Sequence, residues 1–218
     1  CLKSVGISFD DVDEIAFAFQ PLYHIQEAYI RPALSDSERI GVLVKDIGRI
    51  EENLYTKELI REKTGFTGLI NYYHHHHCHL ASTWYPSGFE EALVASYDGI
   101  GEIETGLLAM GRMGSLDIFH SSSRYPDSLG LLYSAFTYFI GFKVNSGEYK
   151  LMGLAPYGEP KYKKLILDNL INLRDDGTFR LNMSYFNYAT GLTMVNEKFS
   201  NLFGHKPRKP EKDLLTQF

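Results

Sequence analysis

The chain alternates between short apolar runs of strand length and longer segments whose apolar residues recur at helical spacing. Turn-forming residues bound the short runs, as is typical of buried strands. These runs occupy residues 15–19, 69–73, 92–97, 105–110 and 116–120. Helical periodicity marks residues 35–63, 128–140 and 160–174, and Ser35 or Asp36 is placed to cap the first of these segments. Strands mixed with helices, around a hairpin-rich middle, predict an α/β or mixed-sheet domain in preference to a helical bundle or a sandwich.

A histidine tract follows the second predicted strand, with five histidines among the six residues 74–79. If a helix begins there, His75 and His79 lie four residues apart on one helical face and can share one ion. Neutral imidazole suits Fe(II), zinc or a similar divalent metal. The alternative is a run of solvated or packed histidines without a ligand. Cys78 lies one position off the shared face, so we interpret it as a packing residue.

The predicted strand at 92–97 ends in Asp98-Gly99-Ile100-Gly101, which places one carboxylate at a tight turn. Glycines allow backbone N–H groups to approach a phosphate or a metal-bound ligand closely, so Gly99 and Gly101 are candidate cofactor-binding positions. Asp-Gly turns are also common as purely structural features. Because this turn follows the histidines by one loop and strand, Asp98 is a candidate third metal ligand.

A glycine-rich segment at residues 141–158 carries several polar side chains beside an apolar helix. Its apolar stretch at 151–155 indicates a half-buried wall, a surface suited to a small anionic ligand. Lys150 and Gly153 are therefore candidate cofactor-binding residues. Lys150, with Glu148 beside it, is also a candidate catalytic residue that would hold the charge of an anionic ligand, and we expect its ammonium group to emerge from packed surroundings. In the alternative interpretation, Glu148 and Lys150 only brace the loop.

Composition and charge disfavour several classes of protein. The 218 residues carry a formal charge of −5, and the closest approach to a basic run is Lys206, Arg208 and Lys209 around Pro207, which disfavours a nucleic-acid partner. Two cysteines give no disulfide framework, so a reducing, cytoplasmic location is expected. No apolar run reaches the roughly 20 residues of a membrane span. The chain begins without Met and stops within an apolar pattern, so we expect it to be a piece of a longer protein.

Four segments, in the same order along the chain, resemble a known protein family. They are residues 75–92, 97–102, 125–137 and 148–158, the last reading Glu-Tyr-Lys-Leu-Met-Gly-Leu-Ala-Pro-Tyr-Gly. Together they resemble the nodulation-protein-U and cephalosporin-carbamoyltransferase family. Alignment on Ala81-Ser82 matches the family's paired histidines to His75 and His79, although His74 and His77 are additional histidines.

The resemblance implies the Kae1-like version of the actin/hexokinase/heat-shock-70 (ribonuclease H-like) fold, with 1–218 as part of one carbamoyl-transfer domain. Relatives pair this domain with a downstream YrdC-like domain that makes carbamoyl adenylate from carbamoyl phosphate and ATP. The carbamoyl group then passes to an acceptor hydroxyl on a small molecule or sugar. The resemblance also implies a metal, Fe(II) by expectation, at His75 and His79, and an active-site carboxylate at Asp98.

Three alternatives remain open beside this hypothesis. The first is a tRNA threonylcarbamoyl-transfer or hydrogenase-maturation protein on the same fold, which the acidic charge and the segments at 128–137 and 148–158 disfavour. The second is a non-catalytic metal or nucleotide sensor. The third, a zinc hydrolase, would need Glu after the first histidine, where this chain has His76. A first strand upstream and a further metal-ligating aspartate downstream are expected outside 1–218, so the segment alone is expected to be inactive. A homodimer is compatible with the sequence.

Overall fold

The computed structural model describes residues 2–189 and 191–209, a mixed α/β chain that divides into two units. The first unit comprises Cys1–Val94, Gly101–Ile103 and Gly111–Leu116, and the second comprises Ala95–Ile100, Glu104–Met110 and Asp117–Phe218. Within the described residues, no helix combines the length and the apolar character that crossing a bilayer requires. The α/β class predicted from the sequence is confirmed.

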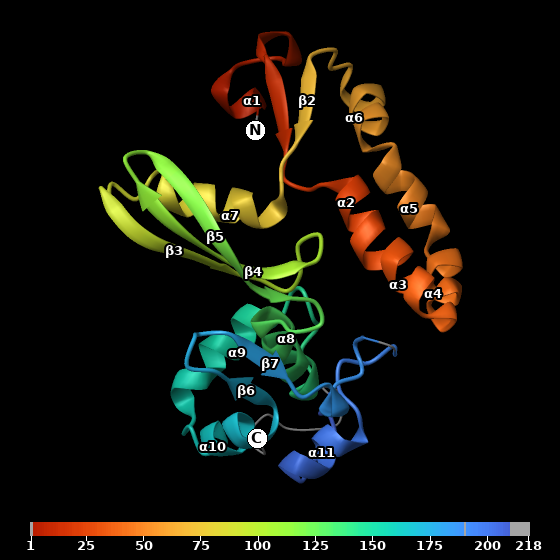
Figure 1. Ribbon diagram of the computed structural model, residues 1–218, viewed down its shortest axis with the longest axis vertical. Coiled ribbons are helices and arrows are strands. Elements are labelled where there is room, and N and C mark those ends of the chain that lie inside the picture. Colours follow the sequence, from red (N-terminus) through yellow and green to blue (C-terminus); the bar gives the residue numbers. More distant parts are fainter. Residues whose placement is uncertain (1, 190, 210–218) are drawn as a thin grey trace. The chain divides into compact units, whose positions relative to one another are not determined.

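The first unit is built on a short parallel strand pair with a helical connection (Figure 1). Its elements are α1 (Leu2–Val5), η1 (Phe9–Asp11), β1 (Glu14–Phe17), α2 (Pro21–Ile25), η2 (Gln26–Ile30), α3 (Arg31–Ser35), η3 (Ser37–Arg39), α4 (Ile40–Lys45), α5 (Ile47–Leu54), α6 (Thr56–Thr64), β2 (Leu69–Tyr72) and α7 (His75–Trp84). β1 and β2 pair in register from Glu14↔Leu69 to Phe17↔Tyr72. The two predicted strands are confirmed, and their parallel pairing sends the chain through α2 to α6 in between.

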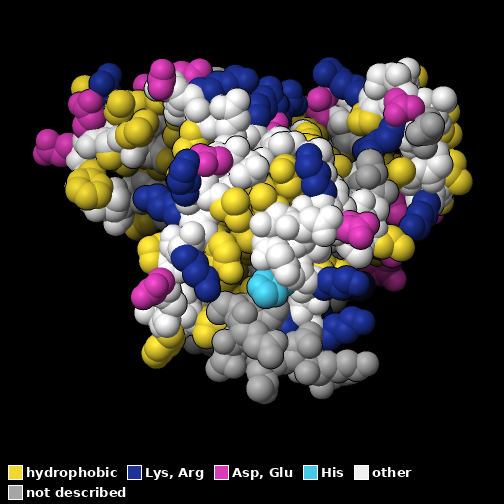
Figure 2. All heavy atoms as spheres, turned by 90° about the horizontal axis from the view of Figure 1, so that it is seen from below, with side chains coloured by type: hydrophobic (Ala, Val, Ile, Leu, Met, Phe, Trp, Pro, Cys, Tyr) yellow, Lys and Arg dark blue, Asp and Glu magenta, His cyan; other side chains and the backbone are white. Residues whose placement is uncertain are grey.

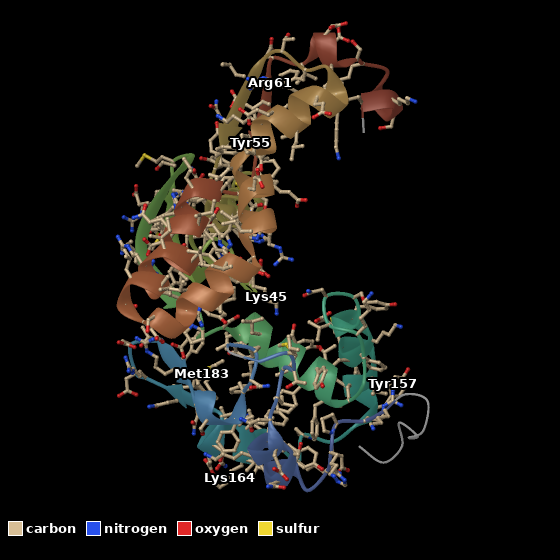
Figure 3. The ribbon with its side chains drawn as sticks, turned by 90° about the vertical axis from the view of Figure 1, so that its right-hand side faces the viewer. Lys45, Tyr55, Arg61, Tyr157, Lys164 and Met183 are labelled. Atoms are coloured by element: carbon tan, nitrogen blue, oxygen red, sulfur yellow. The ribbon has the colours of Figure 1, made fainter. Side chains whose placement is uncertain are left out.

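The predicted continuous helix at 35–63 is wrong in detail, because three separate helices occupy it. Asp46 and Tyr55 leave α-helical geometry, with ψ values of 11° and 18°, and so divide α4 from α5 and α5 from α6. Ser35 closes α3, and α4 has no side-chain cap. Figure 3 shows Lys45, Tyr55 and Arg61 along these helices. The apolar periodicity was correct, but periodicity does not reveal the breaks.

Three strands in sequence order form one sheet, β3-β4-β5. They are β3 (Glu91–Tyr97), β4 (Glu104–Arg112) and β5 (Ser115–Arg124), and they confirm the three predicted strands of the middle. Met113 and Gly114 make the tight link between β4 and β5, with φ values of 47° and 76°. The sheet matters for the site because Asp98 follows β3 directly.

The second unit encloses the main apolar core. Its further elements are α8 (Leu129–Phe139), α9 (Glu148–Leu154), η4 (Ala155–Tyr157), α10 (Lys163–Asn169), β6 (Ile171–Leu173), β7 (Phe179–Leu181), η5 (Met183–Tyr185) and α11 (Glu197–Phe203). β6 and β7 form an antiparallel hairpin from Ile171↔Leu181 to Leu173↔Phe179. The core centres on Phe199, Leu170 and Ala135, none of which is exposed. Burying Phe199 from α11 against α8 is what fixes the C-terminal helix in this unit.

Two expectations for the second unit need correction. The helix predicted over 160–174 is shorter, because it ends at Asn169 and the chain turns into the β6–β7 hairpin, whose loop contains Gly177 at a φ of 81°. The glycine-rich segment at 141–158 contains a helix, α9, where a loop-like wall was expected. The helix predicted at 128–140 is confirmed as α8, capped by the Ser128 hydroxyl, which accepts the N–H of Leu131.

Basic and acidic side chains are mixed on the surface of the protein. On the face shown in Figure 2, the described Lys and Arg side chains are interspersed with acidic and apolar ones. In the second unit, Lys164 pairs with Asp168 across one helical turn, and Arg180 pairs with the largely buried Asp127. Pairing of this kind distributes the basic residues among partners of opposite sign.

Candidate functional site

The histidine tract lies at a strand-to-helix junction, as the sequence predicts. β2 ends at Tyr72 and α7 begins at His75, so His75 and His79 stand one helical turn apart. Their Nε2 atoms are 3.0 Å apart, and the two rings are nearly perpendicular, at 85°. The junction therefore brings two imidazole nitrogens to one point beside the helix.

The outer nitrogen of His75 is held by the backbone. Its Nδ1 lies 3.1 Å from the carbonyl oxygen of Ala18, just past the end of β1. A carbonyl oxygen only accepts hydrogen bonds, so Nδ1 carries the proton and Nε2 presents its lone pair toward His79. Backbone bonding of this type is how proteins fix the tautomer of metal-binding histidines.

The spacing of the two nitrogens fits a shared ion. Two nitrogens at about 2.1 Å from one ion and at right angles to each other are about 3.0 Å apart. In this structure the two Nε2 atoms share a hydrogen bond, in which His79 is the donor. A bound ion would replace that hydrogen bond, because both Nε2 atoms would then present their lone pairs to the ion.

The remaining histidines of the tract have other surroundings. His76 is buried, with 1% of its surface exposed, and His74 approaches the carboxylate of Glu102 at 3.8 Å. The rings of His74 and His77 lie 4.9 Å apart. Burial raises the pKa of the Cys78 thiol, with the nearby Glu102 charge acting in the same direction, so the sulfur stays a neutral thiol at pH 7. Among these residues, His75 and His79 have the geometry of a ligand pair.

Gly101 and Glu102 belong to the same unit as the histidines and lie against the start of α7. An added Cβ on Gly101 would stand 2.9 Å from His76 Cδ2 and 3.2 Å from His75 Cβ. The Glu102 carboxylate accepts the backbone N–H of His75 at 3.1 Å. Gly101, expected to approach a cofactor, is thus required by close packing against the histidines. Sequence reasoning missed Glu102, because a glutamate after an Asp-Gly turn usually points into solvent.

Asp98 belongs to the second unit, where three neighbours fix its turn. Its N–H donates to the carbonyl oxygen of Thr105 at 3.0 Å, and its Oδ1 accepts the N–H of Gly99 at 2.6 Å. The Ser128 hydroxyl donates to the carbonyl oxygens of Asp98 and Gly99 at 2.8 and 2.7 Å. Gly130 lets α8 reach this turn, since an added Cβ would stand 2.4 Å from the Gly99 nitrogen. Ser128 and Gly130 were not predicted as supports for Asp98.

Chain connectivity limits how far Asp98 can be from the histidines. Only two residues separate it from Gly101, which lies against His75. Three residues of extended chain span about 11 Å at most, so the Asp98 backbone stays near the start of α7 whatever the arrangement of the two units. This tether makes Asp98 a reasonable candidate for the third ligand.

The glycine-rich segment holds Glu148 and Lys150 in different ways. The Glu148 carboxylate accepts the Ser134 hydroxyl at 2.9 Å and the N–H groups of Asn145 and Gly147 at 2.9 and 3.1 Å. Burial alone raises its pKa, but these hydrogen bonds outweigh burial and lower the pKa below the usual value. Glu148 therefore ties the first turn of α9 to α8.

Lys150 is exposed, and its ammonium group lies 5.9 Å from the centre of the Tyr149 ring. Its apolar neighbours are exposed too: Tyr149 by 64%, Met152 by 66% and Tyr157 by 89%. Tyr157 projects at the end of η4 in Figure 3. The prediction that packed residues surround Lys150 is wrong within this chain, because Tyr149 and Met152 on α9 and Tyr157 on η4 all face solvent. Among the residues that the structure describes, none stands within 4 Å of an added Cβ on Gly153, so their packing does not explain that glycine.

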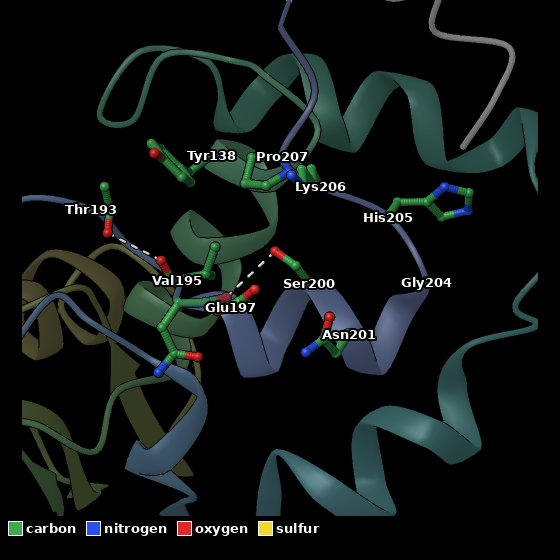
Figure 4. A pocket seen from close by; sticks show the side chains of 11 residues that line it. Tyr138, Thr193, Val195, Glu197, Ser200, Asn201, Gly204, His205, Lys206 and Pro207 are labelled. Atoms are coloured by element: carbon green, nitrogen blue, oxygen red, sulfur yellow. Dashed lines mark hydrogen bonds between the residues drawn. The ribbon is translucent and has the colours of Figure 1, made fainter.

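Two hollows of the second unit lie apart from the predicted residues. One, of about 600 Å³, opens beside α11 and is lined by residues that include Tyr138, Glu197 and His205 (Figure 4). The other, of about 650 Å³, is largely apolar and lies between α8, α9 and α11, with Phe139 and Leu151 in its wall. Neither includes Asp98, Glu148 or Lys150 in its lining.

Comparison with known proteins identifies the family of the chain. A family model described as the carbamoyltransferase N-terminus matches residues 1–218. An uncharacterized protein of Synechocystis is 48% identical over 98% of the chain, and nodulation protein NolNO of Sinorhizobium fredii is 32% identical over 83%. Nodulation protein NolO of Bradyrhizobium diazoefficiens is 36% identical over half of the chain. These alignments cover 36%, 26% and 20% of the relatives, so the chain spans about a third or less of their length. The chain belongs to the carbamoyltransferase N-terminal family.

Proposed function

We propose that this chain is the carbamoyl-transferring part of an enzyme that moves a carbamoyl group from carbamoyl adenylate to a hydroxyl of a small molecule or sugar. The donor would be made from carbamoyl phosphate and ATP by a YrdC-like domain of the whole protein. One observation carries the proposal: within a chain of this family, His75 and His79 converge to 3.0 Å with the His75 tautomer fixed by Ala18. The mixed α/β architecture supports an actin/hexokinase-like fold as part of the same proposal.

The proposed metal ligands are His75, His79 and Asp98, which together offer two ring nitrogens and one carboxylate oxygen. Such a mixed set with open positions suits Fe(II). When bound, the ion supplies positive charge that polarises the oxygen atoms of the carbamoyl donor. The Ala18 carbonyl and the Glu102 carboxylate keep the His75 ring oriented whether or not an ion is present.

The chain's own residues then act on the donor and the acceptor. The acceptor oxygen attacks the carbamoyl carbon, the bond from that carbon to the phosphate oxygen breaks, and AMP leaves. If the Asp98 carboxylate is not engaged as a metal ligand, it instead orients the acceptor hydroxyl and takes its proton as the new bond forms. Lys150 stabilises the phosphate charge of the adenylate, and Gly99 and Gly153, which lack side chains, let the nucleotide approach the backbone closely.

The test is to supply the whole protein with ATP, radiolabelled carbamoyl phosphate and a panel of hydroxyl-bearing sugars and small molecules. The proposal predicts label in an acceptor, with one AMP released per carbamate formed. Label transferred only to tRNA, and only when threonine is present, would assign the tRNA-modifying alternative. Nucleotide binding without turnover of any acceptor would identify a sensor and contradict the proposal.

A further inference from the structure

The first unit contains a buried carboxylate that the transfer chemistry does not use. Glu102 is 1% exposed, although an ionised carboxylate is costly to remove from water. Hydrogen bonds offset that cost: Oε1 accepts the N–H of Gln20 at 2.7 Å and of His75 at 3.1 Å, and Oε2 lies 3.3 Å from the same His75 nitrogen. These hydrogen bonds satisfy the buried carboxylate, so its position is specified by the fold.

The partners of Glu102 come from separate parts of the first unit. Gln20 follows β1, His75 opens α7, and the Glu102 carbonyl oxygen lies 2.7 Å from Nδ1 of His24 in α2. The N–H of His75 is one of the first donors of α7, which have no partner inside the helix. A carboxylate there also complements the positive end of the helix dipole. Glu102 therefore joins the helix that carries the histidines to the strand pair and to α2.

The same residue ends the turn that begins at Asp98. Gly101, its neighbour, packs against His75 so closely that a Cβ would be 3.2 Å from the His75 Cβ. His75 is thus located by three contacts: Glu102 at its backbone nitrogen, Gly101 at its Cβ and Ala18 at Nδ1. Moving Glu102 would therefore move the His75 Nε2 relative to His79.

We infer that Glu102 is the positioning residue of the metal centre. It fixes the first turn of α7 so that His75 and His79 converge. The inference rests on the proposed metal function. Residues that orient metal ligands typically change metal affinity by about 10- to 100-fold when they are replaced.

The experiment titrates the whole protein with Co(II), whose visible absorption reports ligand geometry. Glu102→Ala is expected to weaken Co(II) binding about 10- to 100-fold and to shift the spectrum at saturating metal. Glu102→Gln keeps one acceptor oxygen for Gln20 and His75, so it should recover most of the affinity. Glu91→Ala removes an exposed carboxylate paired with Arg112 and serves as the matched control, with no change expected.

Gly101→Ala perturbs the same junction without removing the buried charge, and it replaces Glu102→Ala if that variant does not fold. Its added methyl group should displace His75 and change the Co(II) spectrum in the same way. A wild-type spectrum and affinity in folded Glu102→Ala or Gly101→Ala protein would overturn the inference and leave the metal proposal intact. Absence of Co(II) binding by the unaltered protein would instead overturn the metal proposal and the inference with it.

Discussion

The histidine junction and the glycine-rich segment both carry polar residues next to glycines, but they are held in different ways. At the junction, contacts arrive from residues distant in sequence: Ala18 and Glu102 both bind His75. In the glycine-rich segment, Glu148 binds the nearby Asn145 and Gly147 and one residue of α8, while Lys150 is exposed. Long-range contacts fix a side chain's position, whereas exposure leaves it free to adjust to a ligand.

This difference separates two kinds of site residue. His75 and His79 are oriented before any ligand arrives, as a metal site requires. Lys150 would reach its partner only when the nucleotide is bound, and Glu148 has its hydrogen-bonding capacity used within the fold. The contrast predicts that changes at Glu148 and at Lys150, both in the first turn of α9, will have separable effects on activity and stability.

Lys150→Ala should give the largest effect of the changes in this segment. In the whole protein, we expect acceptor carbamoylation to fall roughly a hundredfold, as for loss of one well-placed charged group, while adenylate formation persists. Because Lys150 is exposed, the melting temperature should not change. The two half-reactions are followed separately by AMP release and by label in the acceptor. Unchanged carbamoylation would remove Lys150 from the transfer step.

Glu148→Gln should act mainly on stability, lowering the free energy of unfolding by about 1–2 kcal/mol at pH 7. The pKa of Glu148 is lowered in the folded protein, so its stabilisation is present above the usual glutamate range and is lost as pH falls through the lowered pKa. The difference in unfolding free energy between wild type and variant should therefore shrink in acid. Denaturant unfolding at pH 7 and below pH 4 measures it, and a constant difference would show that the charge is not responsible.

Cys78→Ala should have the smallest effect. The thiol is half-buried and lies one helical position off the face shared by His75 and His79, so it is not placed to join their pair. Metal affinity should stay within about twofold of wild type, with a modest stability loss from the missing sulfur. A loss of metal as large as that of a histidine variant would show that Cys78 is a ligand and would contradict the proposed ligand set.

Local sequence signals predict most of the helices and strands. The helix breaks and the last hairpin are the exceptions. Apolar runs of strand length located β1 to β5, and the Ser128 cap located α8, because these signals lie within a few residues. The breaks at Asp46 and Tyr55 have no such local signal. The β6–β7 hairpin does have one, the Asp176-Gly177 turn, but it was missed because 160–174 was interpreted as one helix.

The candidate site divides in the same way. The four-residue spacing was enough to predict the pairing of His75 with His79, because residues four apart are neighbours on one face of a helix. Glu102 could not be identified, because its importance comes from Gln20, 82 residues away in sequence. Lys150 was expected in packed surroundings from its apolar neighbours, but α9 presents Tyr149 and Met152 to solvent.

Metal content of the tag-free whole protein tests the central claim most directly. Elemental analysis should find about one divalent ion per chain in the wild type and almost none after His75→Ala and His79→Ala together. His77→Ala, an exposed histidine of the same helix, is the matched control and should retain the ion. Equal metal in the wild type and the double variant would contradict the assignment of His75 and His79 as the ligands.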